Sequence, residues 1–78
     1  MKSDIEIYMV LLKLEQQFQK SSRYESRVGD IQEAAYYEAN AEGVTEAMIE
    51  LFGWHGQQRL RNQAYDIQAE EEEGKANV

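Results

Sequence analysis

The sequence contains no cysteine and no proline, and it has a single histidine, His55. Without cysteine the chain cannot form a disulfide or bind a metal through thiolates, and such a composition is typical of a reducing compartment. Basic residues are also scarce, because 8 lysines and arginines stand against 15 acidic residues, for a net charge of −7. This balance argues against direct binding to nucleic acid or to an anionic membrane.

Long apolar runs are missing as well. The longest, residues 7–12, falls far short of the roughly 20 residues that span a bilayer, and we therefore expect a cytoplasmic protein. With 42% apolar residues, the chain is nevertheless too hydrophobic to be disordered throughout. We predict one helical domain over residues 1–73 and a disordered tail over residues 74–78. A domain this small has a thin core with no disulfide to reinforce it, so we expect a homodimer.

The first predicted helix runs from about residue 4 to about residue 28. Ser3 and Glu6 match the S-x-x-E capping box at its start, and Gly29 is a suitable glycine just beyond its end. Between these signals, four apolar residues recur at helical spacing: Ile7, Leu11, Leu14 and Phe18. Further apolar residues lie next to them in the sequence. A face this wide is typical of a helix inside a core or an interface.

The second predicted helix is one long rod from about residue 30 to about residue 52, with Asp30 and Glu33 as its capping signal. Its apolar residues follow a heptad-like pattern: Ala34, Tyr37, Ala41, Val44, Met48 and Leu51. The pattern passes through Gly43, which costs about 1 kcal/mol in a helix interior. The alternative is a break at Gly43, with Thr45 capping a second piece.

A turn over residues 53–56 and a third helix over residues 57–72 complete the prediction. Leu60, Ala64 and Ile67 form a narrow apolar stripe on this helix, so we expect it to pack at an edge. The predicted fold class is all-α, a small three-helix bundle with a long central helix. We expect a homodimer to complete it, with the first two helices forming the shared core.

Negative charge is concentrated in the second helix, because residues 30–53 contain six acids and no base. Four glutamates recur there at every fourth position, and we call them the acidic ladder: Glu38, Glu42, Glu46 and Glu50. On a helix they rise by about 6 Å per step. Like charges at this spacing destabilise a helix by about 0.2–0.5 kcal/mol per pair, so something should compensate them or use them.

Internal pairing is one interpretation of the ladder. The first helix carries a basic stripe beside its apolar face: Lys13, Lys20, Arg23 and Arg27. If the two helices fold back at Gly29, antiparallel pairing brings the stripes together. The expected contacts join Arg23 to Glu33 or Glu38, Lys20 to Glu42, and Lys13 to Glu46.

A ladder that faces outward is the second interpretation. Its carboxylates then resemble successive phosphates of a nucleic-acid strand, and the helix can block the basic groove of a nucleic-acid-binding protein. A solvated face without a role is the third. Tyr36 and Trp54 join the ladder as candidate partner-binding residues, because exposed aromatics often anchor interfaces. Trp54 has an alternative role as a cover over the turn and the end of the core.

Catalytic motifs are absent from the pattern. No serine is placed beside His55, no E-x-x-H motif occurs, and the pairs Asp30/Glu33 and Glu46/Glu50 do not reproduce a paired E-x-x-E, E-x-x-D arrangement. Arg59 and Arg61 suit a recognition helix, but residues 70–73 are all acidic and would repel phosphates. We expect no enzyme activity, no cofactor, no metal and no direct contact with nucleic acid.

The sequence therefore predicts a non-enzymatic inhibitor or regulator that binds another protein. Small size, acidity and missing catalytic chemistry are common among viral and mobile-element inhibitors, including those that block host nuclease defences, and this is an analogy of type alone. The alternative is a structural or assembly module that acts through helical homo- or hetero-oligomers. Binding through the ladder should weaken as salt rises, whereas assembly through apolar surfaces should not.

Overall fold

The computed structural model describes residues 2–76, which form two helices, α1 (Asp4–Arg27) and α2 (Ile31–Ala76), and no strand within that range. The predicted all-α class is confirmed. Gly53 interrupts α2 with φ 74° and ψ 164°, a backbone conformation that is essentially restricted to glycine. We call residues 31–52 the proximal arm of α2 and residues 54–76 its distal arm.

Local capping explains where the helices begin and where α1 ends. The Ser3 side chain accepts from the Glu6 N–H, and the Glu6 carboxylate accepts from the Ser3 N–H, so the predicted capping box is present. Gly29 follows α1 with φ 89°, the left-handed conformation expected just beyond a helix end. Asp30 Oδ1 then accepts from the Glu33 N–H at 3.0 Å, which caps α2.

The proximal arm is continuous through Gly43, as the heptad pattern predicts, so the alternative break at that glycine is wrong. The predicted turn over residues 53–56 is also wrong, because within it only Gly53 leaves the helical conformation. The distal arm continues to Ala76, beyond the predicted start of the tail at residue 74. Residues 77–78, the end of that predicted tail, lie outside the described residues.

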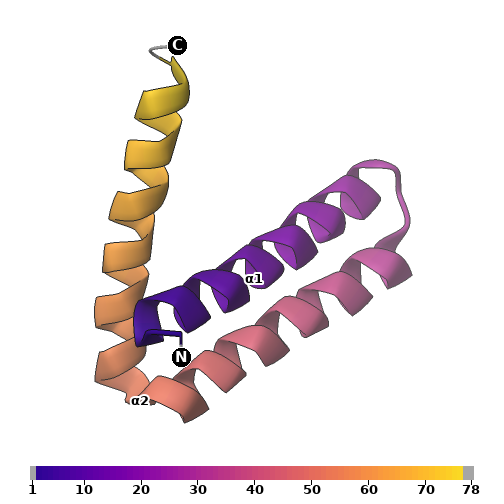
Figure 1. The fold of residues 1–78 in the computed structure, drawn as a ribbon. Helices are drawn as coiled ribbons and strands as arrows, with labels where there is room; N and C mark the ends of the chain where they lie inside the picture. Colours follow the sequence, from indigo (N-terminus) through magenta and orange to yellow (C-terminus); the bar gives the residue numbers. More distant parts are fainter. Residues whose placement is uncertain (1, 77–78) are drawn as a thin grey trace.

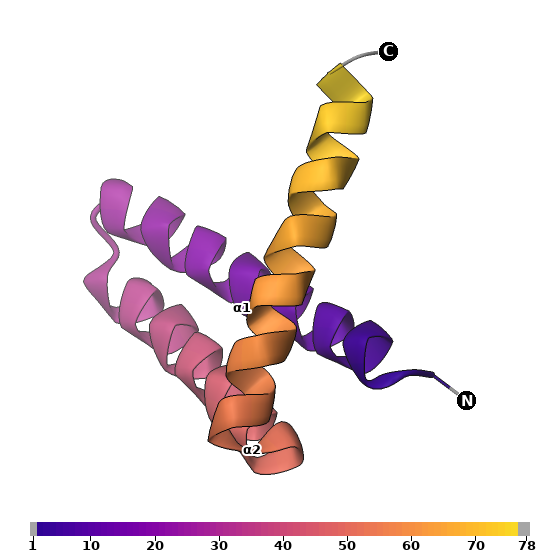
Figure 2. The same ribbon diagram turned by 90° about the vertical axis from the view of Figure 1, so that its left-hand side faces the viewer.

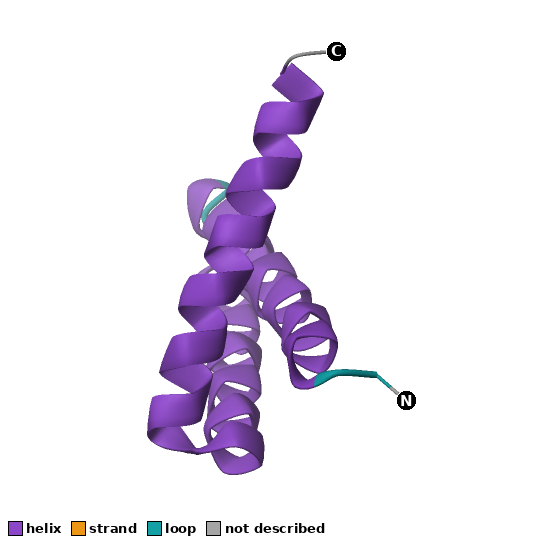
Figure 3. Ribbon diagram, turned by 60° about the vertical axis from the view of Figure 1, so that its left-hand side comes forward, coloured by secondary structure: helices purple, strands orange, loops and turns teal. Residues whose placement is uncertain are grey.

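α1 and the proximal arm form an antiparallel hairpin, and the distal arm turns at Gly53 to cross one face of it (Figures 1 and 2). The distal arm then projects beyond the hairpin (Figure 3). The structure thus has two helices, one of them kinked, where the sequence predicted a bundle of three. A single glycine is enough for this change of direction, because the helix resumes immediately at Trp54.

The core lies where the three segments meet, and it is thin. Among the described residues, six apolar side chains are buried, and two of them are alanines: Tyr8, Leu12, Ala41, Met48, Leu60 and Ala64. On α1 the buried face is displaced from the predicted one, since Ile7 and Leu14 remain 37% and 39% exposed. The proximal-arm pattern is confirmed at Ala41 and Met48 but not at Leu51, which is exposed.

Candidate functional site

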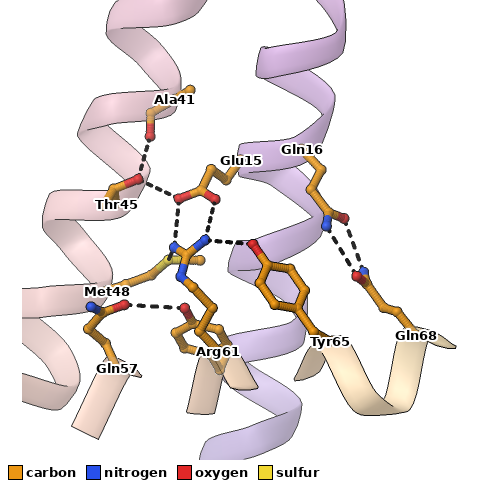
Figure 4. A network of polar contacts seen from close by, with 10 residues as sticks. Glu15, Gln16, Ala41, Thr45, Met48, Gln57, Arg61, Tyr65 and Gln68 are labelled. Carbon is orange, nitrogen blue, oxygen red and sulfur yellow. Dashed lines mark hydrogen bonds and ion pairs between the residues drawn. The ribbon is translucent and has the colours of Figure 1, made fainter. Parts of the chain in front are cut away.

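A buried ion pair joins α1 to the distal arm (Figure 4). The Glu15 side chain is 3% exposed, and Arg61 donates Nη1 to its Oε1 and Nη2 to its Oε2, both at 3.0 Å. This bidentate geometry is among the strongest interactions between a guanidinium and a carboxylate. Because the Glu15 carboxylate is buried, loss of Arg61 would leave that charge uncompensated.

Neighbouring side chains complete the environment of the pair. The Thr45 hydroxyl of the proximal arm donates to Glu15 Oε2, and its oxygen also lies 3.1 Å from the Ala41 carbonyl oxygen (Figure 4). Arg61 Nη1 donates to the Tyr65 hydroxyl at 3.1 Å. The carboxylate of Glu15 therefore receives hydrogen bonds from both arms of α2.

The electrostatics of the pair favour its charged form. Burial alone raises the pKa of Glu15, but hydrogen bonds from Arg61 and Thr45 and the positive charge of Arg61 together hold that pKa below its ordinary value. The hydrogen bond to Glu15 raises the pKa of Arg61. Burial likewise raises the pKa of Tyr8, which lies in the same cluster. The pair is fully ionised at neutral pH.

Two further polar contacts tie the distal arm to α1. The side-chain amides of Gln16 and Gln68 exchange hydrogen bonds at 3.1 and 3.0 Å (Figure 4). The Tyr8 hydroxyl donates to Oε1 of the buried Gln57 at 3.4 Å. Within the described part of the chain, every buried side-chain nitrogen and oxygen has a hydrogen-bond partner. The network thus positions the two arms of α2 around α1.

Sequence reasoning missed this network. Glu15 follows Tyr8 and Leu12 at helical spacing, so a carboxylate on the buried face of α1 was the available signal. Arg61 lies beside the buried Leu60 on the distal arm, but the sequence pattern indicates only phosphate contacts for it. Its partner is 46 residues away in the sequence, and helical periodicity does not reveal such a distant pairing.

The acidic ladder points to solvent along the proximal arm. All four of its glutamates are exposed, and among the described residues none of them forms an ion pair with a basic side chain. Arg23 lines an open groove with Glu38 and Glu42, yet the predicted internal contacts are not formed. The basic stripe of α1 instead borders the distal arm, where Lys20, Arg23 and Arg27 line a groove shared with Glu71 and Glu72.

Both aromatic residues that are candidates for partner binding, Tyr36 and Trp54, are exposed. Tyr36 is 60% exposed and packs edge-on against Tyr37, with ring centroids 5.4 Å apart. Two helical positions turn the chain by about 200°, so Tyr36 points well away from Glu38. Trp54 is exposed, but it lies beyond the kink at the start of the distal arm.

A metal site and a membrane-spanning helix were also sought among the described residues. No group of three or more histidine, cysteine, aspartate or glutamate side chains among them is arranged to hold a metal ion. No helix in this part of the chain has an apolar stretch long enough to cross a membrane. Comparisons with family models, with curated proteins and with solved structures gave no match.

Proposed function

We propose that the protein is a non-enzymatic regulator that binds a basic surface on another protein through its acidic ladder. The supporting observation is that four carboxylates lie exposed and unpaired on an arm whose surrounding segment, residues 30–53, contains no base. A row of unpaired like charges destabilises a helix, and a cationic partner would offset that repulsion. A cytoplasmic setting and an inhibitory role belong to this proposal.

The most suitable partner surface is the groove of a nucleic-acid-binding protein. Each ladder step rises about 6 Å and turns about 40°, so the four carboxylates span about 18 Å along one flank of the arm. One strand of DNA carries a charge about every 3.4 Å along its axis. The ladder therefore has about half the charge density of a strand, and it can replace some phosphates but not all of them.

A variant with all four ladder glutamates changed to glutamine tests this proposal. Immobilised wild-type protein should retain basic proteins from a lysate, and duplex DNA should release those that are bound through their nucleic-acid groove. Retention should fall as salt rises, because exposed charges are screened. The variant should retain none of the DNA-released proteins, while helical content measured by circular dichroism stays unchanged.

The matched control changes the four glutamates at residues 70–73 to glutamine, which removes the same charge from the distal arm. This control should retain the same proteins as the wild type. If both variants lose binding equally, net charge and not the ladder is responsible. If the ladder variant binds like the wild type, the proposal is wrong.

Assembly through helical surfaces is the second candidate function, and a separate observation favours it. Ten large apolar side chains are exposed among the described residues, several of them along α1 and the proximal arm. Surface of this kind usually marks contact with another chain when it is contiguous.

A further inference from the structure

The acidic end of the distal arm faces the basic stripe of α1 across an open groove. Gln68 makes the last hydrogen bond between the two helices among the described residues, and beyond it they diverge (Figures 1 and 2). Bases line the α1 wall of the groove and acids line its distal wall: Lys20, Arg23 and Arg27 against Glu71 and Glu72. The groove has a volume of about 580 Å³, and within the described chain no ion pair crosses it.

Glu71 borders every base of the stripe. A second groove has Glu71 in its wall together with Lys13, and the other three bases share the first groove with it. Arg23 has acids on another side as well, because it lines the groove that Glu38 and Glu42 border. In the part of the chain that is described, the stripe is therefore bordered by carboxylates but not ion-paired with them.

The helical geometry of the distal arm divides its four consecutive glutamates into two pairs. At about 100° per residue, Gln68, Glu71 and Glu72 fall within an arc of about 100°, so Glu71 and Glu72 continue the side that contacts α1. Glu70 and Glu73 lie about 150° from the middle of that arc. All four side chains are exposed, but only the first pair faces the basic stripe.

Without these acids, the stripe would have the form of a phosphate-binding surface. Its four bases lie within about 80° of arc on α1 and span about 21 Å along it. One strand of DNA carries a charge about every 3.4 Å along its axis, so the stripe is long enough to meet three or four phosphates. Contacts of this kind provide affinity without reading the base sequence.

We propose that Glu71 and Glu72 form an autoinhibitory shield, which keeps the basic stripe of α1 from binding a nucleic-acid strand. Both acids line the same groove as the bases, so they repel a phosphate that enters it. Salt screens such repulsion only weakly within about 10 Å. A protein that uses its acidic ladder near a nucleic-acid-binding partner thereby avoids binding the partner's nucleic acid itself.

The shield goes beyond the proposed function and does not rest on it. The ladder lies on the proximal arm and the shield on the distal arm, so each can be changed while the other stays intact. The test of the shield uses a purified oligonucleotide and no protein partner. A failure of one proposal is therefore distinguishable from a failure of the other.

Fluorescence anisotropy of a labelled oligothymidine strand at low salt tests the shield. The double variant Glu71→Gln/Glu72→Gln should bind this strand on the order of tenfold more tightly than the wild type, because two like charges are removed from beside the phosphates. Its affinity should fall with salt at a logarithmic slope of about −2 to −3, as expected for three or four phosphate contacts on a single strand.

The matched control is Glu70→Gln/Glu73→Gln, which has the same net charge, lies on the same helix and faces away from α1. It should bind the strand no more tightly than the wild type. Adding Lys20→Gln and Arg27→Gln to the first variant should remove its gain, since both bases line the unshielded groove. Circular dichroism should show the same helical content in all of these proteins.

Three results would overturn the proposal. The first is a Glu71→Gln/Glu72→Gln variant that binds the strand no more tightly than the wild type. The second is an equal gain in both double variants, which would assign the effect to net charge and not to position. The third is a gain that survives the loss of Lys20 and Arg27, which would place the bound strand elsewhere on the molecule.

Discussion

The two faces of the hairpin show how differently one pair of helices can be used. On one face, the distal arm covers Leu12, Met48 and the ion pair between Glu15 and Arg61, with partners for every buried polar atom in the described chain. On the other face, which we call the open face, Ile7 and Leu14 of α1 are exposed.

The difference shows that tertiary contacts, and not side-chain type alone, determine which residues of α1 are buried. On α1, a glutamate is buried while a leucine one position earlier is exposed. The covered face combines an apolar cluster with a buried charge pair of defined geometry. Among the described residues, the open face has no such pair.

Breaking the ion pair should have the largest effect on the covered face. Arg61→Met leaves the buried Glu15 carboxylate without its partner, and we expect a loss of about 3–5 kcal/mol in the free energy of unfolding. Urea denaturation at neutral pH measures this loss. Arg59→Met is the control, because Arg59 is exposed on the same arm and should change stability by less than about 0.5 kcal/mol.

The same loss should depend on pH in a defined direction. The pKa of Glu15 is lowered in the folded protein, so the pair's contribution is complete above the unfolded value of about 4.3. It is lost as the pH falls from that value through the folded pKa. The difference between wild type and Arg61→Met should therefore shrink in acid, and a difference that grows there would contradict an ionised pair.

Paired leucine truncations compare the two faces directly. Leu12→Ala creates a cavity on the covered face and should cost about 2–5 kcal/mol. Leu14→Ala on the open face should cost less than about 1 kcal/mol, because Leu14 keeps much of its contact with water. Thermal denaturation at low concentration separates the two, and equal losses would mean that the faces do not differ in this way.

The kink should be the next most sensitive feature. Gly53→Ala places a side chain at φ 74° and ψ 164°, which costs about 1–3 kcal/mol for a residue other than glycine. The variant should be less stable, and a straightened α2 would withdraw the distal arm from the covered face. Loss of the tyrosine and tryptophan signals in near-ultraviolet circular dichroism would report that movement, and an unchanged stability would show that the kink is not required.

A second glycine in α2 should respond with the opposite sign. Gly43 is helical, and a Cβ at this position would meet no atom within 4 Å. Gly43→Ala should therefore stabilise the chain by about 0.5–1 kcal/mol, the difference in helix propensity. Urea denaturation measures the gain, and a loss of stability would contradict this expectation.

The elements of the fold could be predicted because their signals are local. Ser3 with Glu6, Gly29, and Asp30 with Glu33 mark helix ends within a few residues of sequence, and the structure confirms each of them. The continuity of the proximal arm followed from the apolar repeat, since burial of Ala41 and Met48 outweighs the cost of Gly43.

The arrangement of those elements could not be predicted, because it depends on distant contacts. The wide apolar face of α1 offered two adjacent stripes, and the buried one contains Tyr8, Leu12 and Glu15, which meet residues of α2 more than 30 positions away. The sequence left open whether the ladder pairs with the basic stripe or faces solvent. In the structure the basic residues Lys20, Arg23 and Arg27 of α1 border Glu71 and Glu72 of the distal arm, a neighbourhood that the sequence does not indicate.

Proton contacts between side chains, measured by nuclear magnetic resonance, would test the contrast between the two faces most directly. The account predicts contacts that join Tyr8 and Leu12 of α1 to Leu60 and Ala64 of the distal arm, and none from Ile7 or Leu14 to that arm. Contacts from Ile7 or Leu14 to the distal arm, or none from Leu12, would contradict it.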